Sequence, residues 1–273
     1  MTSPPDSSLL DAPYPLTEDQ RRRFREDGYI RLPEVFDAET LDRFDREITR
    51  LTLTRNPLAD VPLERRDTYG KAFIQVGNLW EMSPEARRLS FSRRLAGIAA
   101  GLLGVGGVRL WHDQALYKEP GGGFTPWHAD QQYWPMSTSL CVTAWIPLQA
   151  VPAEMGPLSF ARGSHLKRIG RDLEISDDSE RLIREAVRAA GLLEVSEPYA
   201  AGDVSFHLGW TLHRAGPNVT TRPRKVHTVI YMDADMRLAR PANANQQADH
   251  ARWTPSTQVG EVMDDPLNPV LFP

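Results

Sequence analysis

The sequence holds a single cysteine, Cys141, among 273 residues, so it cannot form an internal disulfide. A lone cysteine in a chain of this length is typical of a protein that folds in a reducing compartment. Cys141 stands in the apolar run CVTAWIPL, which favours buried packing over reactivity.

Segments for membrane crossing or export are also missing from the sequence. No apolar run approaches the length of a membrane span. The first residues, MTSPPDSSLLDAPYP, have neither the basic start nor the apolar stretch of a signal peptide. We therefore expect a cytoplasmic protein that does not bind membranes.

A strong positive charge is absent as well. The net charge is −4, and the short run Arg21–Arg23 is expected to be one solvated helix face. Without a basic stripe, nucleic acid is not an expected partner. The chain contains no internal repeat or low-complexity block, and no signal for an oligomeric state.

The residues that are present predict one globular domain. Hydrophobic residues make up 41% of the chain and charged residues 25%, which is ordinary for a soluble protein. We expect a flexible lead-in over 1–16 and a single domain over 17–273. Within that domain we expect a helical part over 17–104, a β core over about 108–235 and a tail or loop over 236–273.

Capping signals mark the expected helices. Thr17 and Gln20 form a capping box, and the helix that they begin should end near Gly28. A second helix is expected over 37–51, followed by an irregular segment over 52–69. Pro84 opens a third helix that should run to about residue 103.

The residue pattern changes at Val108, where β-branched and aromatic residues begin to alternate with others. Further runs typical of strands come after it, interrupted by a GGG loop at 121–123 and by an inserted helix over 178–190. Helices followed by many short strands predict a mainly β fold, a sandwich or jelly roll with helices packed outside it.

The triplet His128-Ala129-Asp130 is the first candidate metal site. Side chains two apart on a strand share a face, so an imidazole and a carboxylate could bind one ion. A second histidine would complete the two-histidine, one-carboxylate set of non-haem Fe(II) oxygenases. The candidates are His112, His165, His207, His213, His227 and His250, although a lone histidine is more often structural than a ligand.

His213 stands out among these candidates because of its downstream neighbours. Asn218 comes five residues later and Arg224 eleven residues later. A guanidinium there could pair with the far carboxylate of a dicarboxylate that chelates the iron. His207 is the rival to His213, and Arg222 is the rival to Arg224; the sequence leaves the roles of His207 and Arg222 open.

Several segments together resemble the phytanoyl-CoA dioxygenase family, within the Fe(II)- and 2-oxoglutarate-dependent oxygenases. They are WHAD at 127–130, AWIPLQAVPAEMGPLSFARGSH at 144–165, GDVSFHLGWTLHRAGPNVTTRPRK at 202–225, KAFIQVGNLW at 71–80 and the closing DPLNPVLFP. The resemblance covers most of residues 17–273.

The resemblance implies a double-stranded β-helix, that is, a cupin-like jelly roll. It also implies Fe(II) held by His128, Asp130 and His213, with 2-oxoglutarate and O₂ as co-substrates. The far carboxylate of 2-oxoglutarate would pair with Arg224. Three further residues match positions of the co-substrate pocket: Gln114, Trp145 and Lys71. Trp145 fits a plain core position equally well.

The expected activity is oxidation of a C–H bond in a small organic substrate. Halogenases of this superfamily replace the carboxylate ligand with a small residue, so the presence of Asp130 argues against chlorination. Hydroxylation, epimerisation, ring closure and desaturation all remain compatible with the sequence. Gln132, Tyr133 and Trp134 come directly after the metal motif and are candidates for substrate contact, although Tyr133 and Trp134 fit the core equally well.

We expect tailoring of a natural product, as in antibiotic and other secondary-metabolite biosynthesis. An acyl-CoA hydroxylase of the same family is an alternative, and the lack of a basic patch argues against it. Two further alternatives are a cupin-like metal-dependent isomerase or hydrolase and a non-catalytic jelly-roll module that binds a ligand. Dependence on Arg224 would separate the oxygenase from these two.

Overall fold

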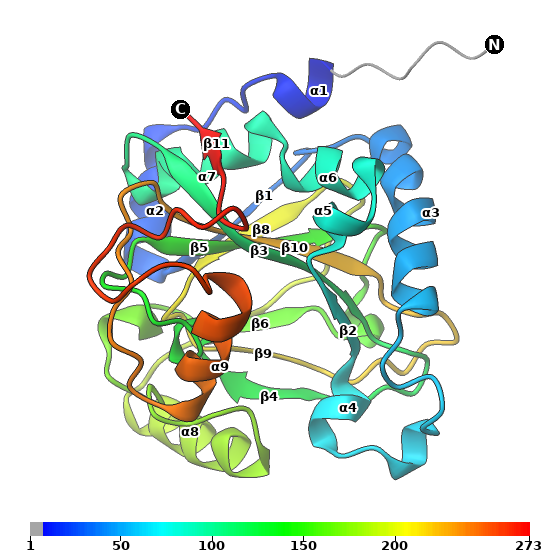
Figure 1. The fold of residues 1–273 in the computed structure, drawn as a ribbon. Helices are drawn as coiled ribbons and strands as arrows, with labels where there is room; N and C mark the ends of the chain where they lie inside the picture. Colours follow the sequence, from blue (N-terminus) through cyan, green and yellow to red (C-terminus); the bar gives the residue numbers. More distant parts are fainter. Residues whose placement is uncertain (1–7) are drawn as a thin grey trace, which may run out of the picture.

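Two antiparallel sheets stacked face to face form the centre of the molecule in the computed structural model, which describes residues 8–273 (Figure 1). The larger sheet contains β1 (Tyr29–Leu32), β2 (Ile74–Gly77), β3 (Val108–Tyr117), β5 (Cys141–Pro147), β8 (Val204–Leu208), β10 (Val226–Asp233) and β11 (Val270–Phe272). The smaller sheet contains β4 (Thr125–His128), β6 (Leu158–Ala161), β7 (Glu194–Ser196) and β9 (His213–Ala215).

The strand order is that of a jelly roll. The larger sheet runs β1-β8-β5-β10-β3-β11, with β2 also paired to β3, and the smaller sheet runs β4-β9-β6-β7. From β3 to β6, and again from β7 to β10, consecutive strands alternate between the two sheets. The predicted double-stranded β-helix is therefore confirmed.

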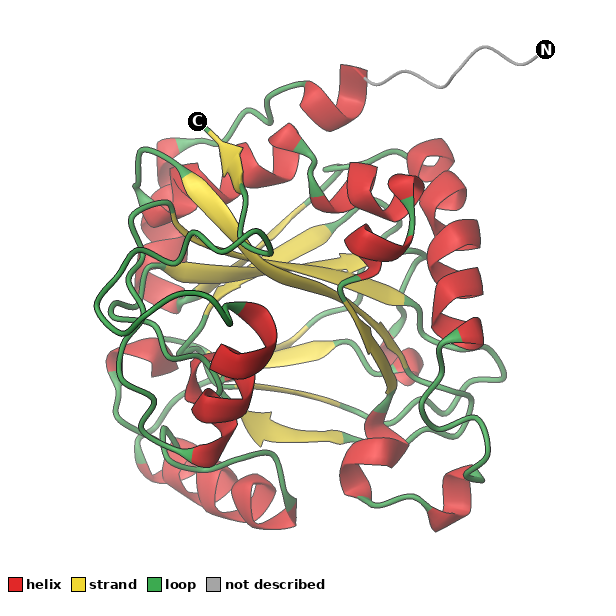
Figure 2. Cartoon of the chain, viewed as in Figure 1, coloured by secondary structure: helices red, strands yellow, loops and turns green. Residues whose placement is uncertain are grey.

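Helices cover the outer faces of this sandwich (Figure 2). They are α1 (Ser8–Asp11), α2 (Glu18–Asp27), α3 (Ala38–Thr54), α4 (Thr68–Ala72), α5 (Leu79–Met82), α6 (Pro84–Ser90), α7 (Arg93–Leu103), α8 (Asp177–Ala189) and α9 (Ala244–Trp253). The largest apolar core lies between the N-terminal helices and the larger sheet, where Phe44, Leu95 and Phe206 are buried. On the opposite side, α8 packs against β4. No helix of residues 8–273 is both long and apolar enough to span a bilayer.

Local capping signals placed several elements correctly. The Thr17–Gln20 capping box opens α2, and Gly28 ends it in the left-handed conformation, with φ of 83°. Helix α3 has Asp37 as its N-cap and buries the predicted apolar face, but it continues three residues beyond the predicted end, to Thr54. The strand predicted from Val108 is β3, and the inserted helix is α8.

The predicted third helix is wrong as a continuous element. It divides into α6 and α7 because Ser92 acts as a new N-cap, its hydroxyl accepting a hydrogen bond from the Leu95 amide. The same hydroxyl donates to the carbonyl oxygen of Leu10 at 2.8 Å. The break thus ties the start of α7 to the N-terminal segment.

Residues 8–16 and the predicted ordered tail contain more helix and strand than the sequence predicts. Residues 1–7 of the expected lead-in lie outside the described part, but α1 comes next and Leu10 is buried. The Arg94 guanidinium donates to the carbonyl oxygens of Ala12 and Pro13, which fixes this segment on α7. In the predicted tail, α9 and β11 are regular elements.

Candidate metal centre

Two neighbouring strands of the smaller sheet bring the three predicted ligands together. His128 ends β4 and is the direct cross-strand partner of His213 on β9. The sequence predicted that Asp130 lies on the same strand as His128. Asp130 instead begins a 3-10 turn, Asp130–Gln132. Ala129 between them keeps an extended backbone, with φ of −125° and ψ of 131°, so both side chains still project to the same side.

The geometry fits a shared metal ion. Asp130 Oδ1 lies 3.6 Å from Nε2 of His128 and 3.6 Å from Nε2 of His213, too far for good hydrogen bonds. One ligand atom from each residue lies within 4.8 Å of the other two. Such spacing leaves room for an ion bound to all three atoms.

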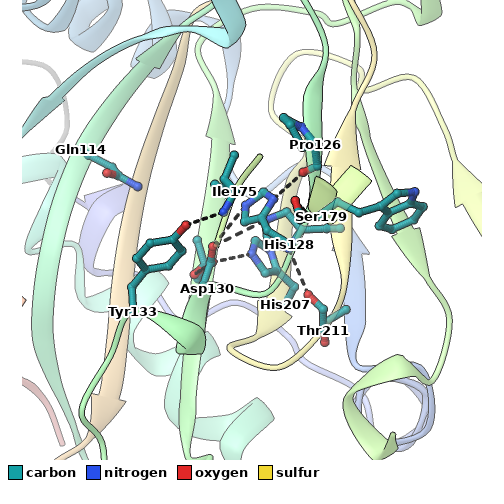
Figure 3. A network of polar contacts seen from close by, with 12 residues as sticks. Gln114, Pro126, His128, Asp130, Tyr133, Ile175, Ser179, His207 and Thr211 are labelled. Carbon is teal, nitrogen blue, oxygen red and sulfur yellow. Dashed lines mark hydrogen bonds and ion pairs between the residues drawn. The ribbon is translucent and has the colours of Figure 1, made fainter. Parts of the chain in front are cut away.

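The two histidines are also in the protonation state that a metal needs. Nδ1 of His128 donates to the Pro126 carbonyl at 2.7 Å, and Nδ1 of His213 donates to the Thr211 carbonyl at 3.0 Å (Figure 3). Because carbonyl oxygens only accept, the proton sits on Nδ1 and the Nε2 lone pair is free. Burial lowers the pKa of both rings to about 4, so both are neutral near pH 7.

The second oxygen of Asp130 is held by the protein. His207 Nε2 donates to Asp130 Oδ2 at 3.0 Å, and the Thr143 hydroxyl donates to the same oxygen at 2.8 Å (Figure 3). Burial alone would raise the pKa of Asp130, but the surrounding imidazoles of His213, His207 and His128 outweigh it and lower the pKa. His207, the rival ligand in the sequence, thus orients the carboxylate from the larger sheet.

A cavity of about 280 Å³ opens from the metal centre between the two sheets. Arg224 lines this cavity with only 2% of its surface exposed. The guanidinium donates through Nη1 to the Gly156 carbonyl, while its Nε has no partner in the described part of the chain. Burial lowers the pKa of Arg224 to about 10, which keeps it charged at neutral pH. A buried cation with a free donor, facing a cavity, fits a carboxylate ligand.

Four of the other predicted residues line the same cavity: Gln114, Trp145, Tyr133 and Trp134. Trp145 lies on β5, and its ring centroid is 5.4 Å from the Arg224 guanidinium carbon, so it packs against the buried cation. The Gln114 side-chain oxygen accepts from Gln75 Nε2, which leaves the amide nitrogen of Gln114 to face the cavity.

Two predicted residues do not line the cavity. Gln132 is buried, and its side-chain oxygen accepts from Asn243 Nδ2 at 3.0 Å, so it anchors the start of α9. Lys71 lies on α4, and its backbone carbonyl accepts from the Gly123 amide at 2.8 Å. Arg222, the rival to Arg224, is exposed.

Sequence reasoning missed the contribution of α9 to the site. Asp249, Arg252 and Trp253 of this helix line the cavity, and Trp253 stacks on His112 with ring centroids 4.6 Å apart. Asn243 caps the helix through its side chain. The segment 243–253 has an N-cap residue and no internal glycine or proline, a signal that could have predicted the helix.

Comparisons with known proteins agree with this geometry. The model of the family described as phytanoyl-CoA dioxygenase (PhyH) matches residues 24–226. An ectoine dioxygenase from Stutzerimonas stutzeri is 25% identical over 248 residues, which cover 83% of this chain and 80% of that protein.

Solved structures of similar enzymes cover almost the whole chain. The non-haem alpha-ketoglutarate-dependent carbocyclase SnoK from nogalamycin biosynthesis is 26% identical, with a TM-score of 0.75 over 95% of this chain and 99% of that one. The epimerase SnoN, in complex with Fe³⁺, alpha-ketoglutarate and nogalamycin RO, is 28% identical, with a TM-score of 0.75 over 97% of this chain and 100% of that one.

Proposed function

The chain belongs to the phytanoyl-CoA dioxygenase family of iron- and 2-oxoglutarate-dependent oxygenases, and from that premise we propose that it tailors a ring-bearing natural product. The observation that carries this proposal is the lining of one cavity. The metal ligands and a buried arginine line it together with several aromatic side chains and two charged groups, Asp249 and Arg252.

The aromatic side chains that line the cavity favour binding of a flat or cyclic substrate. Tyr69, Phe73, Tyr133, Trp134 and Trp253 all line it. Aromatic side chains bind rings through stacked and edge-on contacts, which add to the burial of apolar surface. Similarity to the carbocyclase and the epimerase of nogalamycin biosynthesis points to the same class of substrate.

Each residue of the centre has a definite part in this chemistry. Iron with 2-oxoglutarate and O₂ supplies an oxidant for C–H bonds and releases succinate and CO₂. His128, Asp130 and His213 would hold the iron, and Arg224 would hold the far carboxylate of the co-substrate. His207 and Thr143 keep Asp130 turned so that only Oδ1 faces the metal.

Succinate formation tests this proposal. The Fe(II)-loaded protein is incubated with 2-oxoglutarate, O₂ and a panel of polycyclic, glycosylated, acyl-CoA and small cyclic amino-acid compounds. We expect succinate above the substrate-free rate with ring-bearing natural products, together with an oxidised, epimerised or cyclised product. Succinate coupled only to oxidation of acyl-CoA esters would favour the acyl-CoA hydroxylase instead. An Asp130→Ala variant, which lacks one iron ligand, serves as the inactive control.

A further inference from the structure

Lys118 is a buried lysine with no part in the metal centre described above. It stands directly after β3, and its side chain is fully buried. Its backbone amide donates to the Arg224 carbonyl at 2.9 Å, and the Arg224 amide donates to the Lys118 carbonyl at 2.8 Å. Residues that exchange both hydrogen bonds across antiparallel strands project their side chains to the same face. The side chains of Lys118 and Arg224 therefore project to the same side of the sheet.

The glycine loop at 121–123 wraps around the Lys118 side chain. The ammonium donates to the Gly123 carbonyl and to Thr125 Oγ1, the latter at 3.4 Å. A Cβ atom at Gly122 would come within 2.8 Å of Lys118 Cγ and within 2.8 Å of the Glu119 carbonyl oxygen. The loop thus needs glycine there so that it can close over the lysine.

Asn218 fixes this arrangement from the other strand. Its Nδ2 donates to the carbonyl oxygens of Lys118 at 3.3 Å, Glu119 at 3.2 Å and Arg222 at 2.7 Å. Asn218 is fully buried. The side chain ties the segment after β3 to the segment before β10, and so holds Lys118 and Arg224 in register.

Neither Lys118 nor Arg224 has a carboxylate partner in the described part of the chain. Lys118 has only two oxygen acceptors, both uncharged, and Arg224 has one carbonyl. Burial, and then the charge of Arg224, lower the pKa of Lys118 to about 6. An anion placed beside the two residues would reverse this effect and favour the ammonium form.

Thr125 connects Lys118 to the cavity. An ammonium group only donates hydrogen bonds, so Thr125 Oγ1 must accept from it. The hydroxyl hydrogen of Thr125 is then left to donate elsewhere, and Thr125 lines the cavity together with Arg224. The same cavity is therefore lined by two donors that could serve a carboxylate, one from a hydroxyl and one from a guanidinium.

We propose that Lys118 is a positioning residue for 2-oxoglutarate: it turns the Thr125 hydroxyl toward the far carboxylate held by Arg224 and adds a second positive charge behind it. This inference rests on the proposed function, because it assumes that 2-oxoglutarate is the ligand at Arg224. A purely structural Lys118 would hold the glycine loop and have no preference between ligands with and without that carboxylate.

A pair of keto acids separates the two roles. Binding of 2-oxoglutarate and of 2-oxopentanoate, which carries a methyl group in place of the far carboxylate, is measured by calorimetry on the Fe(II)-loaded full chain without O₂. The variants are Lys118→Met and Thr125→Val, alone and combined. Lys167→Met, at an exposed lysine, is the matched control. Because Thr125→Val changes only one hydroxyl to a methyl group, it keeps the test valid if Lys118→Met does not fold.

We expect Lys118→Met and Thr125→Val each to weaken 2-oxoglutarate binding at least tenfold and to change 2-oxopentanoate binding less than twofold. The double variant should lose little more than Lys118→Met alone, because that change already removes both the positive charge and the orientation of the Thr125 hydroxyl. Equal weakening of both keto acids, or no change in either, would overturn the inference. A wild-type protein that binds no 2-oxoglutarate would instead refute the proposed function itself.

Discussion

The two carboxylate oxygens of Asp130 face different partners, and only one of them would be free for a metal. Oδ1 faces the imidazoles of His128 and His213, while Oδ2 accepts hydrogen bonds from His207 and Thr143. A carboxylate fixed in this way presents a single lone-pair direction to an ion, which favours one-oxygen coordination and leaves other positions open. The orientation of one side chain therefore decides how much of the metal stays accessible to co-substrates.

Removal of one hydrogen bond to Asp130 should weaken metal binding without abolishing it. Thr143→Val keeps the shape of the side chain but deletes the donor to Asp130 Oδ2. We expect Fe(II) affinity to fall by roughly 10-fold to 100-fold, as for other outer contacts of metal ligands. Thr228→Val is the control, since Thr228 also lines the cavity but bonds to the Gln114 carbonyl. Equal Fe(II) affinity in the wild type and Thr143→Val would show that the contact does not position the ligand.

At the scale of elements, α9 closes one wall of the cavity. Trp253 is 7% exposed, stacks on His112 and lies close to Gly77, where an added Cβ would approach its ring to 2.9 Å. The helix is fixed at its start by the hydrogen bond from Asn243 to Gln132, the last residue of the 3-10 turn that begins at Asp130. A segment distant in sequence thus shapes the substrate part of the site.

Removal of the Trp253 ring should lower the stability of the protein without changing its binding of 2-oxoglutarate. Trp253→Ala removes a buried aromatic ring, and we expect the free energy of unfolding to fall by about 3 kcal/mol. Because Trp253 belongs to a different apolar cluster from Trp145, the ring that packs on Arg224, the dissociation constant of 2-oxoglutarate should stay within twofold of the wild-type value. Chemical denaturation and calorimetry measure the two quantities. A large loss of 2-oxoglutarate affinity would mean that α9 also organises the co-substrate end.

A buried polar cluster joins α6 to the larger sheet. The Ser90 hydroxyl bonds to both Asp113 Oδ2 and His227 Nε2, the latter at 2.9 Å, and the Trp80 amide donates to the same Asp113 oxygen at 3.1 Å. The side chains of Ser90, Asp113 and His227 are fully buried. The cluster does not line the cavity, so we assign it to stability rather than to catalysis.

The two ionisable groups of this cluster should make opposite contributions to the pH dependence of the free energy of unfolding. Burial raises the pKa of Asp113 from its ordinary 3.8 to about 7. Between these values the folded state binds more protons at Asp113 than the unfolded state, so this group lowers the free energy of unfolding as pH rises, by up to about 1.4 kcal/mol per pH unit. His227, whose pKa burial lowers to about 3, contributes with the opposite sign.

Asp113→Asn isolates the first contribution, because His227 is present in both proteins. The amide oxygen can still accept from Ser90 and from the Trp80 amide. We expect the stability of the variant relative to the wild type to increase steadily from about pH 4 to about pH 7, measured by chemical denaturation. A difference that does not change with pH would show that Asp113 keeps an ordinary pKa.

Elements with strong local signals could be predicted from the sequence, and their long-range contacts could not. The capping box of α2 and the alternation of β3 depend on neighbouring residues, so both were correct. The break between α6 and α7 has a local cause, the N-cap of Ser92, which the prediction overlooked, whereas the bond from Ser92 to Leu10 is a long-range contact. The role of His207 likewise depends on β8 lying in the opposite sheet from β4 and β9.

At the scale of the whole molecule, each sheet supplies a different half of the site. The smaller sheet provides His128 and His213 from β4 and β9. The larger sheet provides the supports of Asp130, from β5 and β8, and Arg224 immediately before β10. Residues of both sheets therefore line one cavity because the jelly roll stacks its two sheets (Figure 1).

One titration tests whether Arg224 holds 2-oxoglutarate on iron bound by His128, Asp130 and His213. 2-Oxoglutarate is added without O₂ to the Fe(II)-loaded wild type, Arg224→Met and Arg222→Met, and the visible absorption band of the iron-bound keto acid is followed. Arg222 is the matched control because its side chain is exposed. We predict saturable bands of similar affinity for the wild type and Arg222→Met, and affinity at least a hundredfold weaker for Arg224→Met. An unchanged titration for Arg224→Met, or no band for the wild type, would contradict this assignment.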